Sequence, residues 1–276
     1  MKIVDSHQHF WMLRNNFSDW PTPDLNPIFC DFLPKDLTPI LQVNGVTKTI
    51  LIQAAPNEQE TAFLLSIAST CDFVGAVVGW IDFAAPDAEA RLARLAADPK
   101  LRGLRPMVQD IPEQGWLLRR SFDAVYDGMV SAGLTFDALV RRSQIPEVAT
   151  LADRHPGLSI VLDHAGKPDI RKGDFPRWAR DVEHLSLHAN VSCKLSGLWT
   201  EAGSDHSKKV ISPYVKHLIE CFGSSRLMWG SDWPVVNLSG SYADWLNQCQ
   251  EILSSICSVD HAAIFGGNAG RFYGIN

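Results

Sequence analysis

Eight short runs rich in β-branched and other apolar residues recur along the chain, and amphipathic stretches of helical length separate most of them. This alternation is typical of βαβ units on a parallel sheet. The predicted strands cover residues 2–10, 48–55, 73–82, 103–108, 134–140, 159–164, 190–196 and 226–232. The predicted helices cover residues 58–69, 87–97, 120–132, 146–154, 178–188, 208–221 and 242–255. Because eight such units suit a closed sheet better than an open one, we predict an α/β fold, a (β/α)8 TIM barrel.

The segment 11–33 is the longest part of the chain without a helical or strand period. It is rich in proline, asparagine and aromatic residues, so we expect a loop that lies over one end of the barrel, in a position to cover a site. The chain shows no linker, internal repeat or low-complexity stretch. We therefore expect residues 1–276 to form one domain.

The charge balance excludes two classes of partner. Lys and Arg total 25 and Asp and Glu total 31, so the net charge is −6 with neutral histidines, the wrong sign for binding nucleic acid or an anionic membrane. No apolar run reaches roughly 18 residues, and Asp5 and His7 come too early for a signal peptide. The six cysteines include no C-x-x-C pair, which indicates reduced thiols. We expect a cytoplasmic protein whose partner is a small molecule, and a homo-oligomer is compatible with the sequence.

Most candidate residues end predicted strands, where the reactive groups of a parallel barrel lie. These residues are Asp5, His7, His9, Gln53, Trp80, Asp82, Asp163, His164, Lys194 and Asp232. Residues two apart on a strand share a face, so Asp5, His7 and His9 are expected to point together. Two imidazoles at that spacing can hold one metal ion or one substrate oxygen.

His164 and Asp232 end the sixth and eighth predicted strands and would converge on the same barrel mouth as the two histidines. This coincidence favours a functional centre over two half-exposed histidines near a chain start. Asp163 is expected to support the centre through a hydrogen bond. The phase of the sixth strand leaves open which of Asp163 and His164 faces the site.

Five sequence words run in the right order across nearly the entire chain. They are DSHQHFW at 5–11, LRGLRP at 101–106, LDHAGKP at 162–168, KLSGL at 194–198 and GSDWPV at 230–235. Together they make the chain resemble the amidohydrolase superfamily, specifically the amidohydrolase type 2 branch of sugar-lactone and related hydrolases. The words are specific for the family and much less specific for a substrate. The resemblance implies a distorted (β/α)8 barrel.

The resemblance also implies that His7, His9, His164 and Asp232 form the catalytic centre. In metal-dependent relatives the equivalent groups bind a divalent ion, commonly zinc, and the aspartate accepts a proton from the attacking water. Such an ion, or a set of positive donors, polarises the carbonyl while the carboxylate makes water nucleophilic. The implied chemistry is hydrolysis.

The sequence departs from the fullest family pattern at two strands. The fourth carries Arg102 and Arg105 instead of a lysine that could bridge two ions, and residues 134–140 contain no histidine. We therefore expect at most one ion per chain, with zinc as the first candidate, and we expect a chelator to remove it. Hydrolysis without a metal stays open.

Several other residues are candidates for binding the substrate. Arg102 and Arg105 can make forked hydrogen bonds to a carboxylate or hydroxyls, with an ion pair at the barrel end as the alternative. Lys167 can reach the ligand, with a solvated loop lysine as the alternative. The remaining candidates are Gln53, Trp11, Trp80, Trp199 and Trp233. Flat tryptophan faces suit sugar rings, although buried tryptophans more often fill space.

The leading function is hydrolysis of a small sugar lactone, such as a fucono-, rhamnono- or galactono-lactone, with Asp232 activating water and His164 and the two-histidine pair stabilising the oxyanion. The alternative is metal-dependent, non-oxidative decarboxylation of an unsaturated or aromatic acid, which a clustered cationic pocket would favour. A third possibility is a barrel that has lost its activity and only binds a metabolite. Binding alone does not require the residues that gather at this centre, which are Asp5, His7, His9, His164 and Asp232. The exact lactone, its ring size and the oligomeric state stay open.

Overall fold

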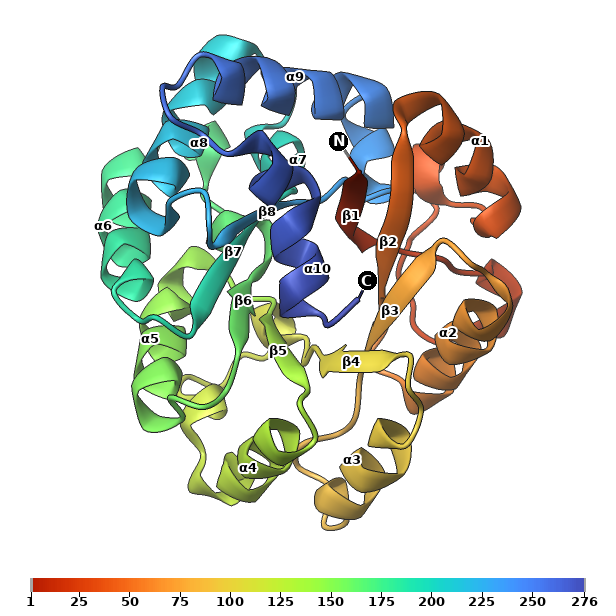
Figure 1. Cartoon of the computed structure of the whole chain (residues 1–276). Coiled ribbons are helices and arrows are strands. Elements are labelled where there is room, and N and C mark those ends of the chain that lie inside the picture. The colour runs from red at the N-terminus through yellow and green to blue at the C-terminus, as the bar shows by residue number, and fades with distance from the viewer. Residues whose placement is uncertain (1, 276) are drawn as a thin grey trace.

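The computed structural model describes residues 2–275, and within them eight parallel strands form one sheet in sequence order. The strands are β1 (Ile3–Gln8), β2 (Val46–Ile52), β3 (Val74–Gly79), β4 (Leu101–Leu104), β5 (Thr135–Ala138), β6 (Ile160–Leu162), β7 (Val191–Leu195) and β8 (Leu227–Trp229). Figure 1 shows them arranged as a ring surrounded by helices. The seam between β8 and β1 closes at the carboxyl ends, where the Asp232 N–H donates to the His7 carbonyl and the His9 N–H to the Trp233 carbonyl, both at 2.8 Å. The predicted (β/α)8 barrel is confirmed.

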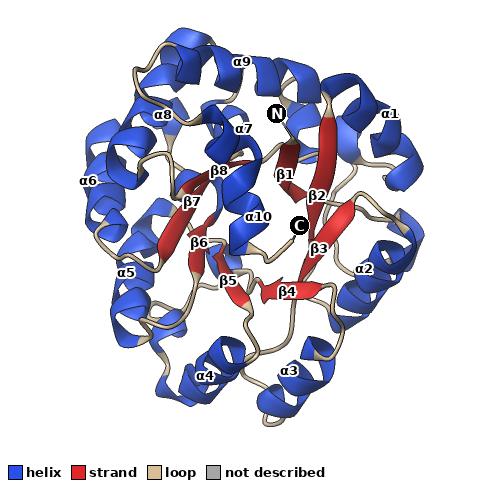
Figure 2. Cartoon of the chain, viewed as in Figure 1, coloured by secondary structure: helices blue, strands red, loops and turns tan. Residues whose placement is uncertain are grey.

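The α-helices follow the strands along the chain and pack around the ring, as Figure 2 shows. They are α1 (Pro34–Asn44), α2 (Glu58–Thr70), α3 (Ala88–Ala96), α4 (Asp123–Ser131), α5 (Ile145–Arg154), α6 (Phe175–Ser186), α7 (Leu198–Ala202), α8 (Lys208–Phe222), α9 (Tyr242–Ser254) and α10 (Asn268–Phe272). All seven predicted helices are present. Helix α1 was not predicted, because Pro39 interrupts a pattern whose buried face consists of Leu37 and Leu41. Within residues 2–275, no helix combines the length and apolar character needed to cross a membrane.

The fourth predicted strand is displaced. We predicted residues 103–108, but β4 spans Leu101–Leu104, so the chain leaves the sheet before Arg105. The apolar residues of this stretch occur on both sides of the arginines, and a single strand of four residues has too few positions to fix its register from sequence. This shift decides which of the two arginines reaches the carboxyl end.

The core has two layers. Most apolar side chains lie between the strands and the outer helices, and a smaller cluster fills the inside of the barrel. The inner cluster includes Val4, Ile50, Ala76, Val161 and Met228, together with residues of the C-terminal segment. Figure 1 shows α10 across the middle of the ring. The amino half of the barrel is thus packed with apolar groups.

The segment between β1 and α1 lies beside the opposite end of the barrel, as predicted for residues 11–33. The backbones of Trp11 and Phe32 exchange two hydrogen bonds, of 3.0 and 2.9 Å, which close the segment into a loop. Residues inside this loop, among them Trp20 and Leu25, line the cavity at the carboxyl end of the barrel. The loop therefore covers one side of the predicted site.

Candidate active site

A cavity of about 660 Å³ opens at the carboxyl end of the barrel. This volume lies in the range of small-molecule binding sites. The candidate residues that line the cavity are His9, Arg105, His164, Lys167 and Asp232. The strand ends thus bring together residues that are more than 200 positions apart in the sequence, as the parallel barrel predicts.

Two histidines of β1 and the aspartate after β8 form a tight triangle of potential ligand atoms. His7 Nε2 lies 3.2 Å from His9 Nε2, and Asp232 Oδ1 lies 3.3 Å from His9 Nε2 and 3.7 Å from His7 Nε2. A tetrahedral zinc ion with ligands at about 2.0–2.1 Å separates its ligand atoms by about 3.3 Å. The triangle therefore fits three ligands of one divalent ion. His164 Nε2 lies 4.0 Å from the same carboxylate oxygen.

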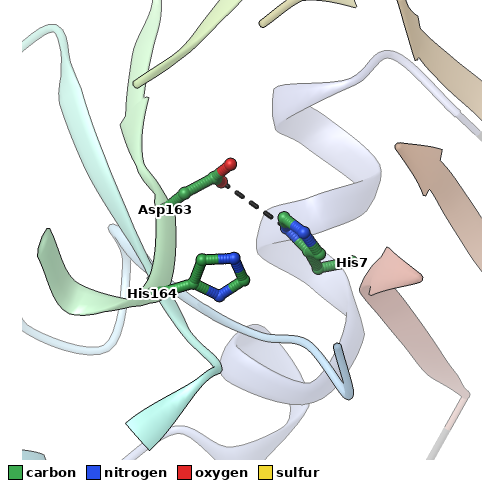
Figure 3. Close-up of side chains that lie close together, drawn as sticks. All are labelled: His7, Asp163 and His164. Atoms are coloured by element: carbon green, nitrogen blue, oxygen red, sulfur yellow. Dashed lines mark ion pairs between the residues drawn. The ribbon is translucent and has the colours of Figure 1, made fainter. Parts of the chain in front are cut away.

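The two residues after β6 both turn toward His7, as Figure 3 shows. The dashed line marks the 3.5 Å ion pair between His7 Nδ1 and Asp163 Oδ1. Adjacent residues of a strand normally face opposite sides, but His164 has a left-handed φ of 52° and so leaves the strand geometry. His164 lines the cavity, whereas Asp163 is fully buried in the barrel interior. This arrangement answers the question that the sequence left open.

The imidazoles of the site are neutral near pH 7. Burial lowers the pKa of His7, His9 and His164, and that of His164 falls to about 4. His9 Nδ1 lies 2.8 Å from the Ile52 carbonyl and must donate to it, which leaves the Nε2 lone pair facing the centre. His164 Nδ1 lies 2.9 Å from the Ser196 hydroxyl. Orientation of the outer nitrogen by a fixed partner is the usual arrangement of metal-binding histidines.

Asp232 is held ionised in a strained backbone position. Burial by itself raises the pKa of this carboxyl, but the positive charge that His164, His9 and His7 carry once protonated in acid outweighs burial and holds the pKa well below its ordinary range. Its φ of 59° lies in the left-handed region, which residues other than glycine rarely adopt. Strain of this kind persists where surrounding structure fixes it, often at functional sites.

Two glycines of the sequence words make room for the histidines. A Cβ on Gly197, which has a φ of 67°, would lie 2.7 Å from His164 Nδ1. A Cβ on Gly230 would lie 2.8 Å from the Cβ of His7. Contacts below 3.0 Å force atoms to shift, so the glycines in KLSGL and GSDWPV allow the imidazoles to lie close to the neighbouring strands.

Asp5 does not join the centre, contrary to the expectation that it points with the histidines of β1. Its carboxylate accepts hydrogen bonds from the Ser231 hydroxyl at 2.6 Å and the Tyr242 hydroxyl at 3.0 Å. The pairing of β1 with β2 shifts in register between Asp5 and Gln8, so the period of two is broken there. Asp5 therefore joins β1 to the segment after β8, and burial raises its pKa to about 6.

Arg105 lines the cavity and is held from behind by buried groups. Its Nη1 lies 3.2 Å from Asp163 Oδ2 and 3.3 Å from His7 Nε2, and its Nη2 donates to the Gln53 carbonyl. The Gln53 side chain donates in return to the Arg105 carbonyl at 2.6 Å. Gln53 is therefore placed to position Arg105, and it is not among the residues that line the cavity.

Two other predicted binding residues lie away from the cavity. Arg102 is the second residue of β4 and lies toward the amino end of that strand, so the prediction that it shares the mouth with Arg105 is wrong. The reason is that β4 ends at Leu104, which brings Arg105 to the carboxyl end of the strand and leaves Arg102 near its start. Trp80 follows β3, its backbone N–H donates to the Thr61 hydroxyl at 2.9 Å, and the residue is absent from the cavity lining.

The other three predicted tryptophans also lie outside the lining of this cavity. The Trp11 indole donates to the Cys30 carbonyl and the Trp199 indole to Gln248 Oε1, both at 2.8 Å. Trp233 is buried and packs edge to face against aromatic neighbours. All three fill space beside the site, the alternative that the sequence had left open.

Sequence reasoning missed most other residues of the lining, and two of them bear on ligand binding. Trp20 comes from the aperiodic loop and offers the aromatic face that was expected from other tryptophans. Glu201 comes from α7, directly after the KLSGL word, and its position there was an available signal. Burial lowers the pKa of the predicted residue Lys167, and the charge of Glu201 opposes this shift. The two residues therefore place opposite charges in the lining of the same cavity.

Comparison with known proteins agrees with this architecture. The profile of the family described as Amidohydrolase matches residues 4–275. The chain is 44% identical to an L-fucono-1,5-lactonase of Burkholderia ambifaria, over 99% of this chain and 96% of that protein, and 34% identical to an L-fucono-1,5-lactonase of Burkholderia multivorans, over 99% and 96%. The crystal structure of an amidohydrolase from Burkholderia multivorans with bound zinc has a TM-score of 0.93 and 34% identity over the whole of both chains. The chain belongs to the amidohydrolase family.

Proposed function

We propose that this protein hydrolyses a small, uncharged sugar lactone to its sugar acid. The observation that carries the proposal is the position of Asp232 Oδ1, 3.3 Å from His9 Nε2 and 4.0 Å from His164 Nε2, at the wall of a cavity of about 660 Å³. Two relatives that match nearly the whole chain, at 44% and 34% identity, are L-fucono-1,5-lactonases, which makes a fuconolactone the first substrate to test. Rhamnono- and galactono-lactones come next.

Asp232 serves as the base in this proposal. Its Oδ1 lies 3.3 Å from His9 Nε2 and 4.0 Å from His164 Nε2, so a water molecule held among these atoms has an ionised acceptor for its proton. The Ser196 hydroxyl orients the His164 ring, and the Ile52 carbonyl orients the His9 ring. The water is thereby fixed relative to a lactone carbonyl in the cavity.

Arg105 stabilises the negative charge that develops on the carbonyl oxygen. Asp163 and Gln53 hold its guanidinium, so the group needs no reorganisation during the reaction. Lys167 and Glu201 offer a donor and an acceptor to ring hydroxyls, and Trp20 offers an apolar face. Together these groups suit the binding of an uncharged, polyhydroxylated ring.

We propose that one divalent ion, zinc in the first instance, is bound by His7, His9 and Asp232, with His164 as a fourth contact. The distances in the triangle and the free Nε2 lone pair of His9 support this assignment. When bound, such an ion polarises the lactone carbonyl and lowers the pKa of a coordinated water. Since a lactone is an activated ester, metal-independent hydrolysis is the alternative to test.

The charge of the cavity disfavours the decarboxylase alternative, which needs cations to hold the carboxylate of an acid. The cations of the lining are Arg105 and Lys167, and its carboxylates are Asp19, Asp110, Glu201 and Asp232. One of the two cations is already paired with the buried Asp163. An uncharged lactone meets less repulsion in this cavity than an anionic acid.

The proposal places the reaction in carbohydrate degradation and in the cytoplasm. All six cysteines lie within residues 2–275 and are free thiols, which suits a reducing compartment.

A panel of aldonolactones in weak buffer with a pH indicator tests the function, because each ring opening releases an acid. We expect the purified protein to acidify at least one six-carbon or 6-deoxy lactone faster than buffer alone. Release of carbon dioxide from unsaturated acids is measured in parallel. No acceleration with any lactone, with or without added zinc or manganese, would refute the proposal.

A further inference from the structure

A network of buried charged groups lies inside the barrel, next to the cavity, and takes no direct part in the proposed reaction. Lys194 Nζ lies 2.6 Å from Asp137 Oδ2 and 3.0 Å from Asp163 Oδ1. The Tyr273 hydroxyl donates to the same Asp137 Oδ2 at 2.6 Å. All four residues are at most 1% exposed. A lysine ammonium so deeply buried depends on these carboxylates to offset the loss of its hydration.

Tyr273 reaches this network from the amino end of the barrel, opposite the cavity. It follows α10, which lies across the middle of the ring in Figure 1. Its ring packs in the inner apolar cluster, and the preceding segment lies against the start of β1, where a Cβ on Gly266 would clash with the Lys2 carbonyl. Burial raises the pKa of Tyr273 well above its ordinary value, so the hydroxyl keeps its proton and acts as a donor.

The same network touches the candidate centre. Lys194 Nζ lies 3.2 Å from His7 Nδ1, and Asp163 Oδ1 lies 3.5 Å from the same nitrogen. His7 is fully buried and is absent from the cavity lining, so its ring orientation depends on these interior contacts. The hydrogen bonds therefore run without a break from the C-terminal segment to the imidazole.

We propose that Tyr273 is a positioning residue whose hydroxyl holds Asp137, and through it Lys194 and Asp163, so that the His7 ring keeps its working orientation. Asp137 Oδ2 accepts hydrogen bonds from the Tyr273 hydroxyl and the Lys194 ammonium. Without the hydroxyl, the ammonium is the remaining donor to this buried oxygen. A small shift of Lys194 then changes both contacts of His7 Nδ1. Loss of such outer contacts typically lowers activity or metal affinity by about 10-fold to 100-fold.

The variant Tyr273→Phe tests this inference, and Tyr126→Phe is its matched control. Tyr126 is also a fully buried tyrosine, but its hydroxyl donates to the Leu117 carbonyl at 2.9 Å, away from the network. For Tyr273→Phe we expect kcat to fall about tenfold. Its KM should stay within about twofold of the wild type, because Tyr273 does not line the cavity. Tyr126→Phe should leave both constants unchanged.

A second measurement needs neither a substrate nor a metal. In metal-free protein labelled with ¹⁵N-histidine, the ring signals of His7, assigned by their loss in His7→Asn, should move in Tyr273→Phe and stay in place in Tyr126→Phe. This readout separates the inference from the proposed function on which its kinetic test rests. If the wild type opens no lactone, the proposed function fails, and the His7 signals still decide the role of Tyr273.

The inference is overturned if folded Tyr273→Phe keeps the wild-type kcat, or if its His7 signals do not move while only its thermal stability falls. A tyrosine that merely fills the barrel would give that result. If Tyr273→Phe does not fold, Asp137→Asn replaces it, because the change keeps the side-chain shape and weakens the hold on Lys194. Unchanged His7 signals in that variant likewise overturn the inference.

Discussion

Replacement of Asp232 by asparagine tests the base on which the proposed reaction depends. The change keeps the shape of the side chain and removes its negative charge. A positioned general base contributes about 10²- to 10⁴-fold to rate, which corresponds to about 3–5 kcal/mol of activation free energy. The structure supports a value in this range, because Asp232 Oδ1 faces the ring nitrogens of His7, His9 and His164 within 4.0 Å and these rings are neutral.

The fold should survive this substitution. The backbone N–H of Asp232 bonds to the His7 carbonyl across the seam, and that bond is unaffected. The assay is initial-rate acidification of the best lactone, with circular dichroism to verify folding. Asp110→Asn is the matched control, because Asp110 lines the cavity rim, is exposed and is absent from the potential metal-ligand groups. A folded Asp232→Asn protein with kcat within threefold of the wild type would refute the assignment.

Three further predictions concern the metal, the substrate and stability. Elemental analysis should find at most one divalent ion per chain, and a chelator should remove it. Two tightly held ions would contradict a single centre. Full activity without any ion would make the histidines of β1 hydrogen-bonding partners of the lactone. Trp20→Ala should raise KM roughly fivefold to tenfold with little change in kcat, since Trp20 lines the cavity, whereas Trp80→Ala should leave KM unchanged; equal effects would argue against this placement. Burial raises the pKa of Glu60 from 4.5 to about 7, so the folded state binds this proton more tightly than the unfolded state. The resulting stability is fully present below pH 4.5 and is lost as the pH rises to 7. At 1.36 kcal/mol per pKa unit the loss is about 3 kcal/mol, and urea unfolding at pH 5 and pH 8 should show a smaller fall for Glu60→Gln than for the wild type, an equal fall being the contrary result.

The sequence predicted the elements of this fold better than the details of its site. His7, His9, His164 and Asp232 were predicted to converge because strand ends of a parallel barrel meet at one mouth, a property of topology that needs no side-chain geometry. The register shift that turns Asp5 away depends on how β1 pairs with β2, which a single strand does not reveal.

Other features depend on contacts between distant parts of the chain. Trp20 lies in a loop without period, so no pattern distinguished it from the buried tryptophans. The contact of Tyr273 with Asp137 joins residues 136 positions apart. Lys194 was recognised as the end of a strand, but its pairing inside the barrel could not be inferred from that position.

The seam between β8 and β1 has a consequence for how the protein becomes active during its synthesis. His7 and His9 leave the ribosome early, whereas Asp232 is made only after all eight strands, since β8 ends at Trp229. Chains are synthesised from the amino terminus at about 5–20 residues per second, so for many seconds the nascent chain carries two of the three atoms of the triangle and lacks the third. An ion held by all three cannot guide the early steps of folding. A chain that stalls or is cut before β8 carries neither the base nor the complete metal-ligand set, and the cell is not exposed to a partly assembled hydrolase.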